Sequence, residues 1–145
     1  MGRFRRLHGQ RGSAIIEMSV ALPVLILMVF GIARFGIAFN NFIVLTDATR
    51  VGARSLAISR GSADPCTTAR TKLLNAATSL NSANVTITSH VNNTNYSGAC
   101  AGQGTTMAAG DEARLTATYP CSVVIFGINF IPSCTMTAQT SVRVE

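Results

Sequence analysis

The first part of the chain is a long apolar stretch with the spacing of a helix. From Ser13, the run SAIIEMSVALPVLILMVFGIA carries one charge, Glu17, before Arg34 is reached. Helical spacing of apolar residues continues well beyond Arg34 with no proline to stop it, so we predict one helix over residues 13–59. Within this helix, about residues 15–38 are apolar enough and long enough to span a bilayer.

The part of this helix that follows the membrane span has two distinct faces. Apolar or small residues recur at helical spacing along one face: Val44, Ala48, Val51, Ser55 and Ile58. The other side is polar, with Asp47 and Arg50 three positions apart. We therefore expect this half to stand in water beyond the membrane. Pro23 lies in the membrane half and should kink it, because proline removes a backbone hydrogen bond and crowds the preceding turn.

The rest of the chain has the pattern of a small mixed domain. The turn RGSADP, residues 60–65, ends in an Asp-Pro pair that is typical of a helix start, so a second helix is predicted over residues 66–80. Alternating apolar and polar residues then predict three strands: residues 85–91, 113–119 and 136–144. Segment 92–110, rich in Asn, Gly, Ser and Thr, is expected to be a loop. The predicted fold class is α+β, with an antiparallel sheet of about three strands.

An apolar segment, VVIFGINFI, lies between the last two predicted strands at residues 123–131. Its large side chains, Phe126, Ile128 and Phe130, are candidates for a partner surface. Two interpretations stand side by side. The segment is either an exposed loop that docks on the membrane or on another subunit, or a buried hairpin tip that packs on the long helix.

The distribution of charge points to a membrane protein. Charged residues make up 12% of the chain, whereas a soluble domain carries about 25%. Four arginines in the first twelve residues supply most of the net charge of +6: Arg3, Arg5, Arg6 and Arg11. Without them, eight basic and six acidic residues leave +2. A basic tail next to an apolar span keeps that end in the cytoplasm, so we do not expect a nucleic acid as partner.

All four cysteines follow the apolar span: Cys66, Cys100, Cys121 and Cys134. If the basic tail is cytoplasmic, they lie in the oxidising compartment, where an even number indicates two disulfides. None has the CxxC or Cys/His spacing of a metal site. Three pairings are possible, and we favour Cys66–Cys100 with Cys121–Cys134 because each closes a local unit. Free thiols in a reducing compartment are the alternative.

The segment most informative about function is a basic leader that ends in Gly12, followed by Ser13, Glu17 and the apolar run. An acidic side chain one turn inside a membrane helix costs free energy, so it is a candidate functional residue. If the chain is cut after Gly12, Ser13 carries a new ammonium and Glu17 becomes the fifth residue. Glu17 of one subunit would then neutralise the amine of its neighbour. The simpler alternative is a glutamate near the interface that reaches water.

These residues resemble the N-terminal part of TadE-like pseudopilins of the tight-adherence (Tad/Flp) pilus machinery. The matching positions, over about residues 11–58, are Gly12, Glu17, Leu22-Pro23, Gly31, Phe35-Gly36 and Arg50-Val51-Gly52-Ala53-Arg54. The chain differs from the family pattern at two positions. Arg34 stands where an acid is frequent, and Met18 stands where an aromatic residue is common.

The resemblance implies a minor pseudopilin that takes part in pilus assembly, surface adhesion and biofilm formation. It implies cleavage between Gly12 and Ser13 by a prepilin peptidase, roles for Glu17 and Pro23 in subunit assembly, and other pilins and pseudopilins as partners. The expected organisation is a leader over residues 1–12, a helix over 13–59 anchored in the bacterial inner membrane, and a periplasmic domain over 60–145.

The chain is not expected to be an enzyme, and no cofactor, metal or small-molecule substrate is expected. The two histidines, His8 and His90, have no nucleophile or carboxylate at a catalytic spacing, and Asp111-Glu112 is interpreted as a solvated strand start. Two alternatives to a pseudopilin remain. One is a periplasmic binding protein with an uncleaved single-span anchor. The other is a secreted protein cleaved after Ala38, which the continuing helical periodicity disfavours.

Overall fold

The computed structural model describes residues 9–121, 124–125, 128–129 and 131–145. The chain divides into two units, Met1–Gly36 and Ile37–Glu145. Helix α1 (Gly9–Ala57) contributes its first part to one unit and its last part to the other. Each unit is described below by itself.

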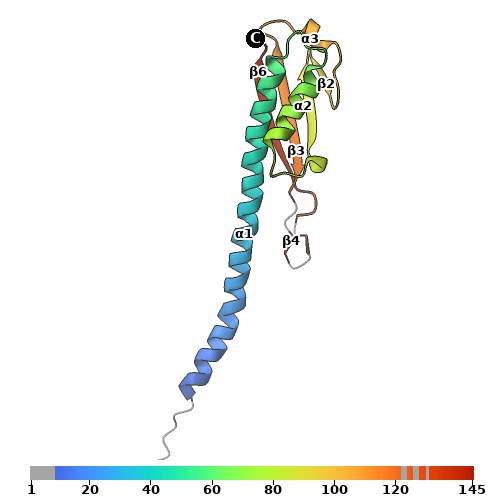
Figure 1. Ribbon diagram of the computed structural model, residues 1–145. Coiled ribbons are helices and arrows are strands. Elements are labelled where there is room, and N and C mark those ends of the chain that lie inside the picture. Colours follow the sequence, from blue (N-terminus) through green and yellow to red (C-terminus); the bar gives the residue numbers. More distant parts are fainter. Residues whose placement is uncertain (1–8, 122–123, 126–127, 130) are drawn as a thin grey trace, which may run out of the picture. The chain divides into compact units, whose positions relative to one another are not determined.

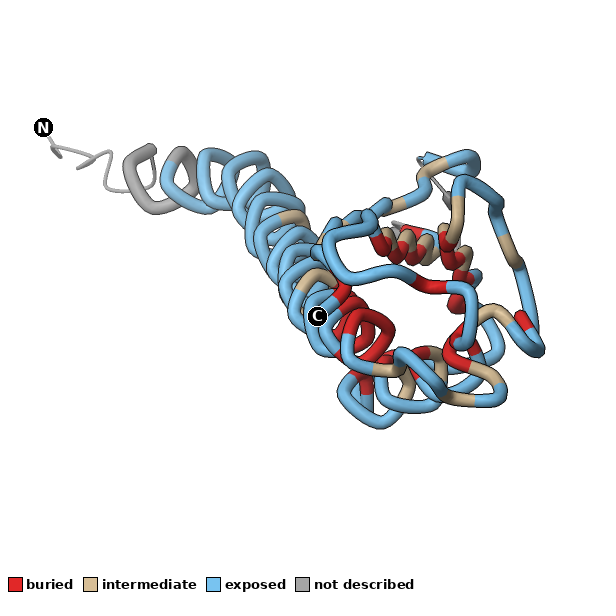
Figure 2. Tube along the Cα trace, turned by 90° about the horizontal axis from the view of Figure 1, so that it is seen from above, coloured by how far each residue is buried: buried red, intermediate tan, exposed pale blue. Residues whose placement is uncertain are grey.

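The first unit is the apolar part of α1. The side chains described before residue 37 are almost all exposed to the surroundings, as the pale-blue helical turns of Figure 2 show. Among the described residues, α1 is the one helix long and apolar enough to cross a membrane, with a mean hydropathy of 2.5 over an 18-residue window. A helix suits that setting because its backbone polar groups bond within the segment itself. Pro23 lies inside α1 without ending it.

The start of α1 differs from the prediction. The helix begins at Gly9 rather than at Ser13, so the last residues of the expected unstructured leader are helical. No acidic residue lies in the first turn of the helix. Two glycines in this turn lower its intrinsic stability by about 1 kcal/mol each relative to alanine. The remainder of the expected leader, residues 1–8, lies outside the described residues.

The second unit is built on a four-stranded antiparallel sheet in the order β2-β1-β3-β6. Its strands are β1 (Thr86–Val91), β2 (Thr94–Tyr96), β3 (Glu112–Pro120) and β6 (Thr135–Arg143). Three of these strands confirm the predicted ones, and the central pair β3–β6 runs in register from Glu112 opposite Arg143 to Pro120 opposite Thr135. β2 was not predicted, because its three residues lie in the polar segment expected to be a loop. The same segment also holds the short helix α3 (Gln103–Thr106).

The two helices lie together on one face of this sheet, with α2 (Pro65–Ala76) beside the last turns of α1 (Figure 1). The buried sheet face carries mainly small and aliphatic side chains: Ile87, Ser89, Val91, Ala113, Leu115, Ala117 and Ala138. The opposite face is polar and rich in threonine. An antiparallel sheet with one covered and one solvated face gives this alternation.

The face that α1 buries only partly coincides with the apolar face seen in the sequence. Of that face, Ala48 and Ser55 are buried, but Val51 and Ile58 are 47% and 58% exposed. The core instead receives a stripe at spacings of three and four: Leu45, Ala48, Thr49, Gly52, Ala53 and Leu56. Two stripes on the same helix had the right periodicity. The one that contains the smaller residues is buried, since small side chains let the helix approach α2 and the sheet closely.

Both disulfides form in the pairing that the sequence favoured. Cys66–Cys100 ties the start of α2 to the loop after β2, and Cys121–Cys134 closes the excursion between β3 and β6. That excursion contains a two-stranded sheet of β4 (Val124–Ile125) and β5 (Ile128–Asn129). Loops of these lengths correspond to roughly 3–4 kcal/mol of stabilisation each in the chain-entropy description. The second helix ends at Ala76, four residues earlier than predicted.

A Gly52→Ala substitution should destabilise the domain. A Cβ atom there would lie 2.5 Å from Leu115 Cδ2 and 3.0 Å from Leu73 Cβ, so either the helix or its neighbours must shift. Overpacking of this kind costs about 1–3 kcal/mol. The measurement is urea unfolding of the full chain in detergent. Gly36→Ala is the control, because nothing lies within 4 Å of its added Cβ; equal midpoints for the two variants would contradict the role given to Gly52.

Candidate functional site

The predicted cleavage junction lies near the N-terminal end of α1. Gly12 and Ser13 follow the first helical residue, Gly9, by three and four positions. The junction is therefore within about the first turn, where the backbone N–H groups have no acceptor inside the helix. A helix end of this kind, with glycine at two positions, opens at little cost.

Glu17 is placed one turn further along α1 and is exposed. Ser13 and Glu17 are four residues apart, the separation at which side chains on a helix are neighbours. The Ser19 hydroxyl forms a hydrogen bond within the helix, donating to the carbonyl of Ile16 at 2.7 Å. Around Glu17 the exposed side chains are apolar, with Ile16 and Met18 67% and 63% exposed.

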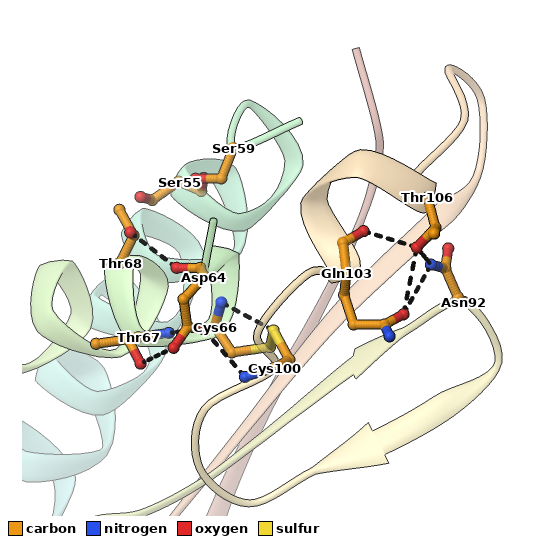
Figure 3. Close-up of a disulfide and its surroundings, with 10 residues drawn as sticks. All are labelled: Ser55, Ser59, Asp64, Cys66, Thr67, Thr68, Asn92, Cys100, Gln103 and Thr106. Atoms are coloured by element: carbon orange, nitrogen blue, oxygen red, sulfur yellow. Dashed lines mark hydrogen bonds between the residues drawn. A yellow bond between two sulfur atoms is a disulfide. The ribbon is translucent and has the colours of Figure 1, made fainter. Parts of the chain in front are cut away.

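A polar cluster holds the start of α2 against the loop that follows β2 (Figure 3). The Asp64 carboxylate accepts hydrogen bonds from the Thr67 backbone N–H at 3.1 Å, the Thr67 hydroxyl at 2.6 Å and the Cys100 backbone N–H at 3.0 Å. Next to it lies the disulfide Cys66–Cys100, and the Cys66 N–H points at the Cys100 sulfur at 3.1 Å. One acidic side chain thus caps a helix and anchors a distant loop.

These hydrogen bonds stabilise the ionised form of the Asp64 carboxyl. Chiefly the Thr67 hydroxyl, and then the Cys100 backbone N–H, hold the pKa of Asp64 below its ordinary value of 3.8. The sequence identified Asp64 as a helix cap, but its contact with Cys100 was not predicted. Only the short spacing to Cys66, two residues on, hinted that cap and disulfide belong to one structural unit.

The same cluster is the best metal-ligand group among the described residues, and its chemistry does not suit a metal. Asp64, Cys66 and Cys100 offer ligand atoms within 4.8 Å of one another. Both sulfurs, however, are joined in a disulfide, whereas a metal requires thiolates. The cluster is therefore a structural joint.

Backbone and side-chain hydrogen bonds extend this joint. Gly61 donates to Gly104 at 2.8 Å and Gly102 donates to Ala63 at 2.8 Å, so the loop before α2 and the loop before α3 run side by side. Gly104 has no room for a side chain, because a Cβ would collide with the backbone of Ser62.

A second set of bonds ties the β1–β2 turn to α3 (Figure 3). The Asn92 amide donates to Gln103 at 3.1 Å and to the Thr106 hydroxyl at 2.6 Å. Asn92 itself has a positive φ of 49°, which asparagine tolerates better than most residues. The loop expected from composition is therefore an ordered structure, held by polar side chains.

A small cavity of about 260 Å³ opens beside the exposed sheet face and is lined by His90, Asn92, Asn93, Asp111 and Glu112. Its two carboxylates already have structural partners. Asp111 accepts from the Ala108 N–H at 2.9 Å, and Glu112 accepts from the Arg114 guanidinium and the Ser141 hydroxyl. The Arg114 contact in particular lowers the pKa of Glu112. These carboxylates organise the strand ends, as expected for a solvated strand start.

The candidate partner surface falls mostly outside the described part of the chain. Phe126 and Phe130 are not among the described residues, and Ile128 is described only as the first residue of β5. The choice between a docking loop and a buried hairpin tip therefore stays a prediction.

Comparison with known proteins bears on the first part of α1. A family model described as TadE-like protein matches residues 12–54, which confirms the resemblance inferred from the sequence. The match covers the junction, the apolar segment and most of the stripe that packs in the domain, and less than a third of the whole chain. No curated protein and no solved structure matches the chain. The family suggests a component of the Tad pilus.

The pH dependence of stability should report on Asp64. Since its folded pKa lies below the unfolded value of 3.8, its contribution is complete above that value and is lost as pH falls through the folded pKa. Asp64→Asn keeps a good helix cap but turns charge-assisted hydrogen bonds into neutral ones, so it should weaken the domain at pH 7 by about 1 kcal/mol and reduce the loss of stability in acid. The measurement is urea unfolding from pH 7 to pH 2.

The matched control is Asp47→Asn, whose carboxylate forms an exposed ion pair with Arg50 at 3.2 Å. Exposed pairs contribute little, so this variant should keep the native pH profile. An Asp64→Asn domain with the same acid response as the native protein would refute the assignment.

Proposed function

We propose that this chain is a minor pseudopilin of a Tad-type pilus, made with a leader that a prepilin peptidase removes between Gly12 and Ser13. The observation that carries the proposal is the TadE-like match, which begins at Gly12. In this proposal the apolar part of α1 anchors the chain in the inner membrane, with the N-terminus cytoplasmic and the domain periplasmic. Prepilin peptidase and other pilins and pseudopilins are its partners in pilus assembly, adhesion and biofilm formation.

The position of the junction supports cleavage. A protease needs an extended substrate, and the first turn of a helix is the cheapest part to open. In α1 this turn has glycine at its first and fourth residues, Gly9 and Gly12, and no acid that would stabilise it. The basic leader adds positive charge at the same end, which opposes the helix dipole.

Removal of the leader changes the electrostatics of the helix end. The new ammonium on Ser13 would itself be unfavourable at a helix N-terminus. Glu17, four residues on, places a negative charge about one turn from that amine, and a neighbouring subunit's Glu17 could pair with the same amine. In lipid such pairing is far better than two isolated charges. This pairing would explain why Glu17 lies in the apolar segment, since a simple membrane anchor needs no acidic residue there.

The domain suits the oxidising side of the membrane. Both disulfides lie in the unit that follows the apolar segment, at residues 66–100 and 121–134, and disulfides persist in the periplasm rather than in the cytoplasm. The basic leader on the opposite side of the span agrees with the same orientation.

The mature N-terminus tests the processing step directly. Intact-mass measurement of the chain purified from membranes should give a protein that begins at Ser13. Gly12→Leu should leave the full-length chain, because a bulky side chain replaces the residue that precedes the cut. Gly9→Leu is the matched control: it stabilises the same helical turn but leaves the residue next to the cut unchanged, so it should still yield a chain that begins at Ser13.

Other outcomes of this measurement distinguish the alternatives. An N-terminus at Met1 in the native chain would support a binding protein with an uncleaved anchor, and one at Phe39 would support a secreted product. Either would overturn the pseudopilin proposal.

Glu17→Gln tests the assembly step separately. The amide keeps the size of the side chain but cannot offset an ammonium, and a charge-assisted hydrogen bond is worth about 1.5–3 kcal/mol. We expect normal cleavage and a roughly tenfold or greater loss of the chain from sheared pili, measured by immunoblot against the membrane fraction. Glu112→Gln, an exposed acid of the domain, is the control. Native recovery of the Glu17→Gln chain in the pilus fraction would count against the pairing.

A further inference from the structure

The outer strand β6 has an unused edge. β6 pairs with β3 on one side over nine positions, and no described strand pairs with its other side. In an antiparallel strand, alternate residues direct their backbone N–H and C=O groups away from the existing partner. This edge therefore offers a row of donors and acceptors that fits one kind of ligand, another extended backbone.

Over most of its length, β6 lacks the usual protections of a sheet edge among the described residues. From Thr135 to Val142 the strand contains no charged residue and no proline. Its ladder with β3 runs through every position without a bulge. Natural proteins block long edges with charged residues, proline, bulges or a covering element, so an uncharged eight-residue edge is suited to pairing with another strand.

The opposite edge of the same sheet is also open. β2, Thr94–Tyr96, pairs with β1 on one side, and no described strand covers its outer side. The three residues carry no charge and include no proline. Among the described residues, the sheet thus ends on both sides in a strand whose outer edge pairs with no other strand.

Strand direction decides which edges can meet. Each of the three pairings in the sheet is antiparallel, so with four strands the two outer ones run in opposite directions. If a second copy lies beside the first in the same orientation, its β2 meets β6 antiparallel. We propose that the sheet continues from one copy of this chain to the next through pairing of β6 with the second copy's β2.

Pairing of β6 with β6 fits less well. The Glu145 N–H reaches the Ala57 carbonyl at 3.5 Å, so α1 and β6 finish at the same end of the domain. Antiparallel β6–β6 pairing would turn one copy upside down, and the two α1 helices would then enter their domains from opposite directions. Copies that share one membrane cannot be arranged in this way. Pairing of β6 with β2 leaves every copy upright.

The side chains are compatible in a register that sets Asn95 opposite Gln139. Asn95 pairs with His90 and so lies on the polar face, and Gln139 is exposed on that face. Thr94 and Tyr96 lie on the helix-covered face, where the same register brings Tyr96 to the small residue Ala138. No like charges oppose each other, and aromatic and amide pairs across strands are favourable.

The contact is short, because β2 supplies three ladder positions, so it is weak for an isolated pair. It is also heterologous, since two different edges meet, and a contact of this type repeats into rings or filaments. A high local concentration of aligned copies would favour it. The pairing uses the folded domain alone and does not depend on cleavage of the leader.

Cysteine cross-linking of the full chain in isolated membranes tests this arrangement. The variant Asn95→Cys/Gln139→Cys, treated with a mild oxidant, should give a ladder of dimers, trimers and larger species on a non-reducing gel. Mass spectrometry should identify a peptide joined through positions 95 and 139. A mixture of the two single variants should stop at dimers. Intact native disulfides, checked by mass, show that the variants are folded.

The pair Asn75→Cys/Asn95→Cys is the control, because Asn75 is exposed on α2 away from the edge, and it should remain monomeric. The proposal is overturned if the double variant at positions 95 and 139 stays monomeric, or if Gln139→Cys alone dimerises as readily, which would indicate β6–β6 pairing. Membrane pelleting of the same samples reports on anchoring independently of any cross-link.

Discussion

The close approach of α1 to the sheet and to α2 at Gly52 is the contact on which the domain depends. Without a Cβ at this position, the helix lies directly against Leu115 of the central strand and Leu73 of α2. The neighbouring residues of the buried stripe, Ala48, Thr49 and Ala53, are also small and buried. Larger side chains on this stripe would lift the helix from the sheet and open the core. The polar joint around Asp64 then fixes the other end of α2, and the first disulfide makes that joint covalent.

Much of this architecture could be predicted from the sequence, because its strongest signals are local. The long helix, the second helix start at Asp64-Pro65 and the three longer strands each follow from periodicity or from turn chemistry within a few residues. The disulfide pairing followed from proximity along the chain. These are features in which neighbouring residues settle the conformation before the tertiary structure does.

The features that escaped prediction depend on contacts between distant residues. Packing against α2 and the sheet determines which of the two stripes on α1 is buried. Val51 and Ile58 therefore remain exposed although they recur at helical spacing. The polar composition of the segment after β1 predicts a loop. In the structure, hydrogen bonds from Asn92 to Gln103 and Thr106 hold this segment in an ordered conformation. The role of Asp64 in holding Cys100 needed the fold to bring the two together. At the predicted cleavage junction, by contrast, the sequence alone supplied every candidate residue.

The two units make separate use of one helix. The described side chains of the first are almost entirely exposed, as lipid or neighbouring helices would require, whereas the last turns of α1 carry the core of the second. A change at Gly12 or Glu17 therefore removes no core contact of the domain, whereas a change at Gly52 or Asp64 disturbs contacts that hold it together. If both units serve assembly as proposed, they do so by different interactions: paired charges in a medium of low polarity in the first unit, and backbone hydrogen bonds between sheet edges in the second. Each contact is weak by itself, and together they favour an array over a pair.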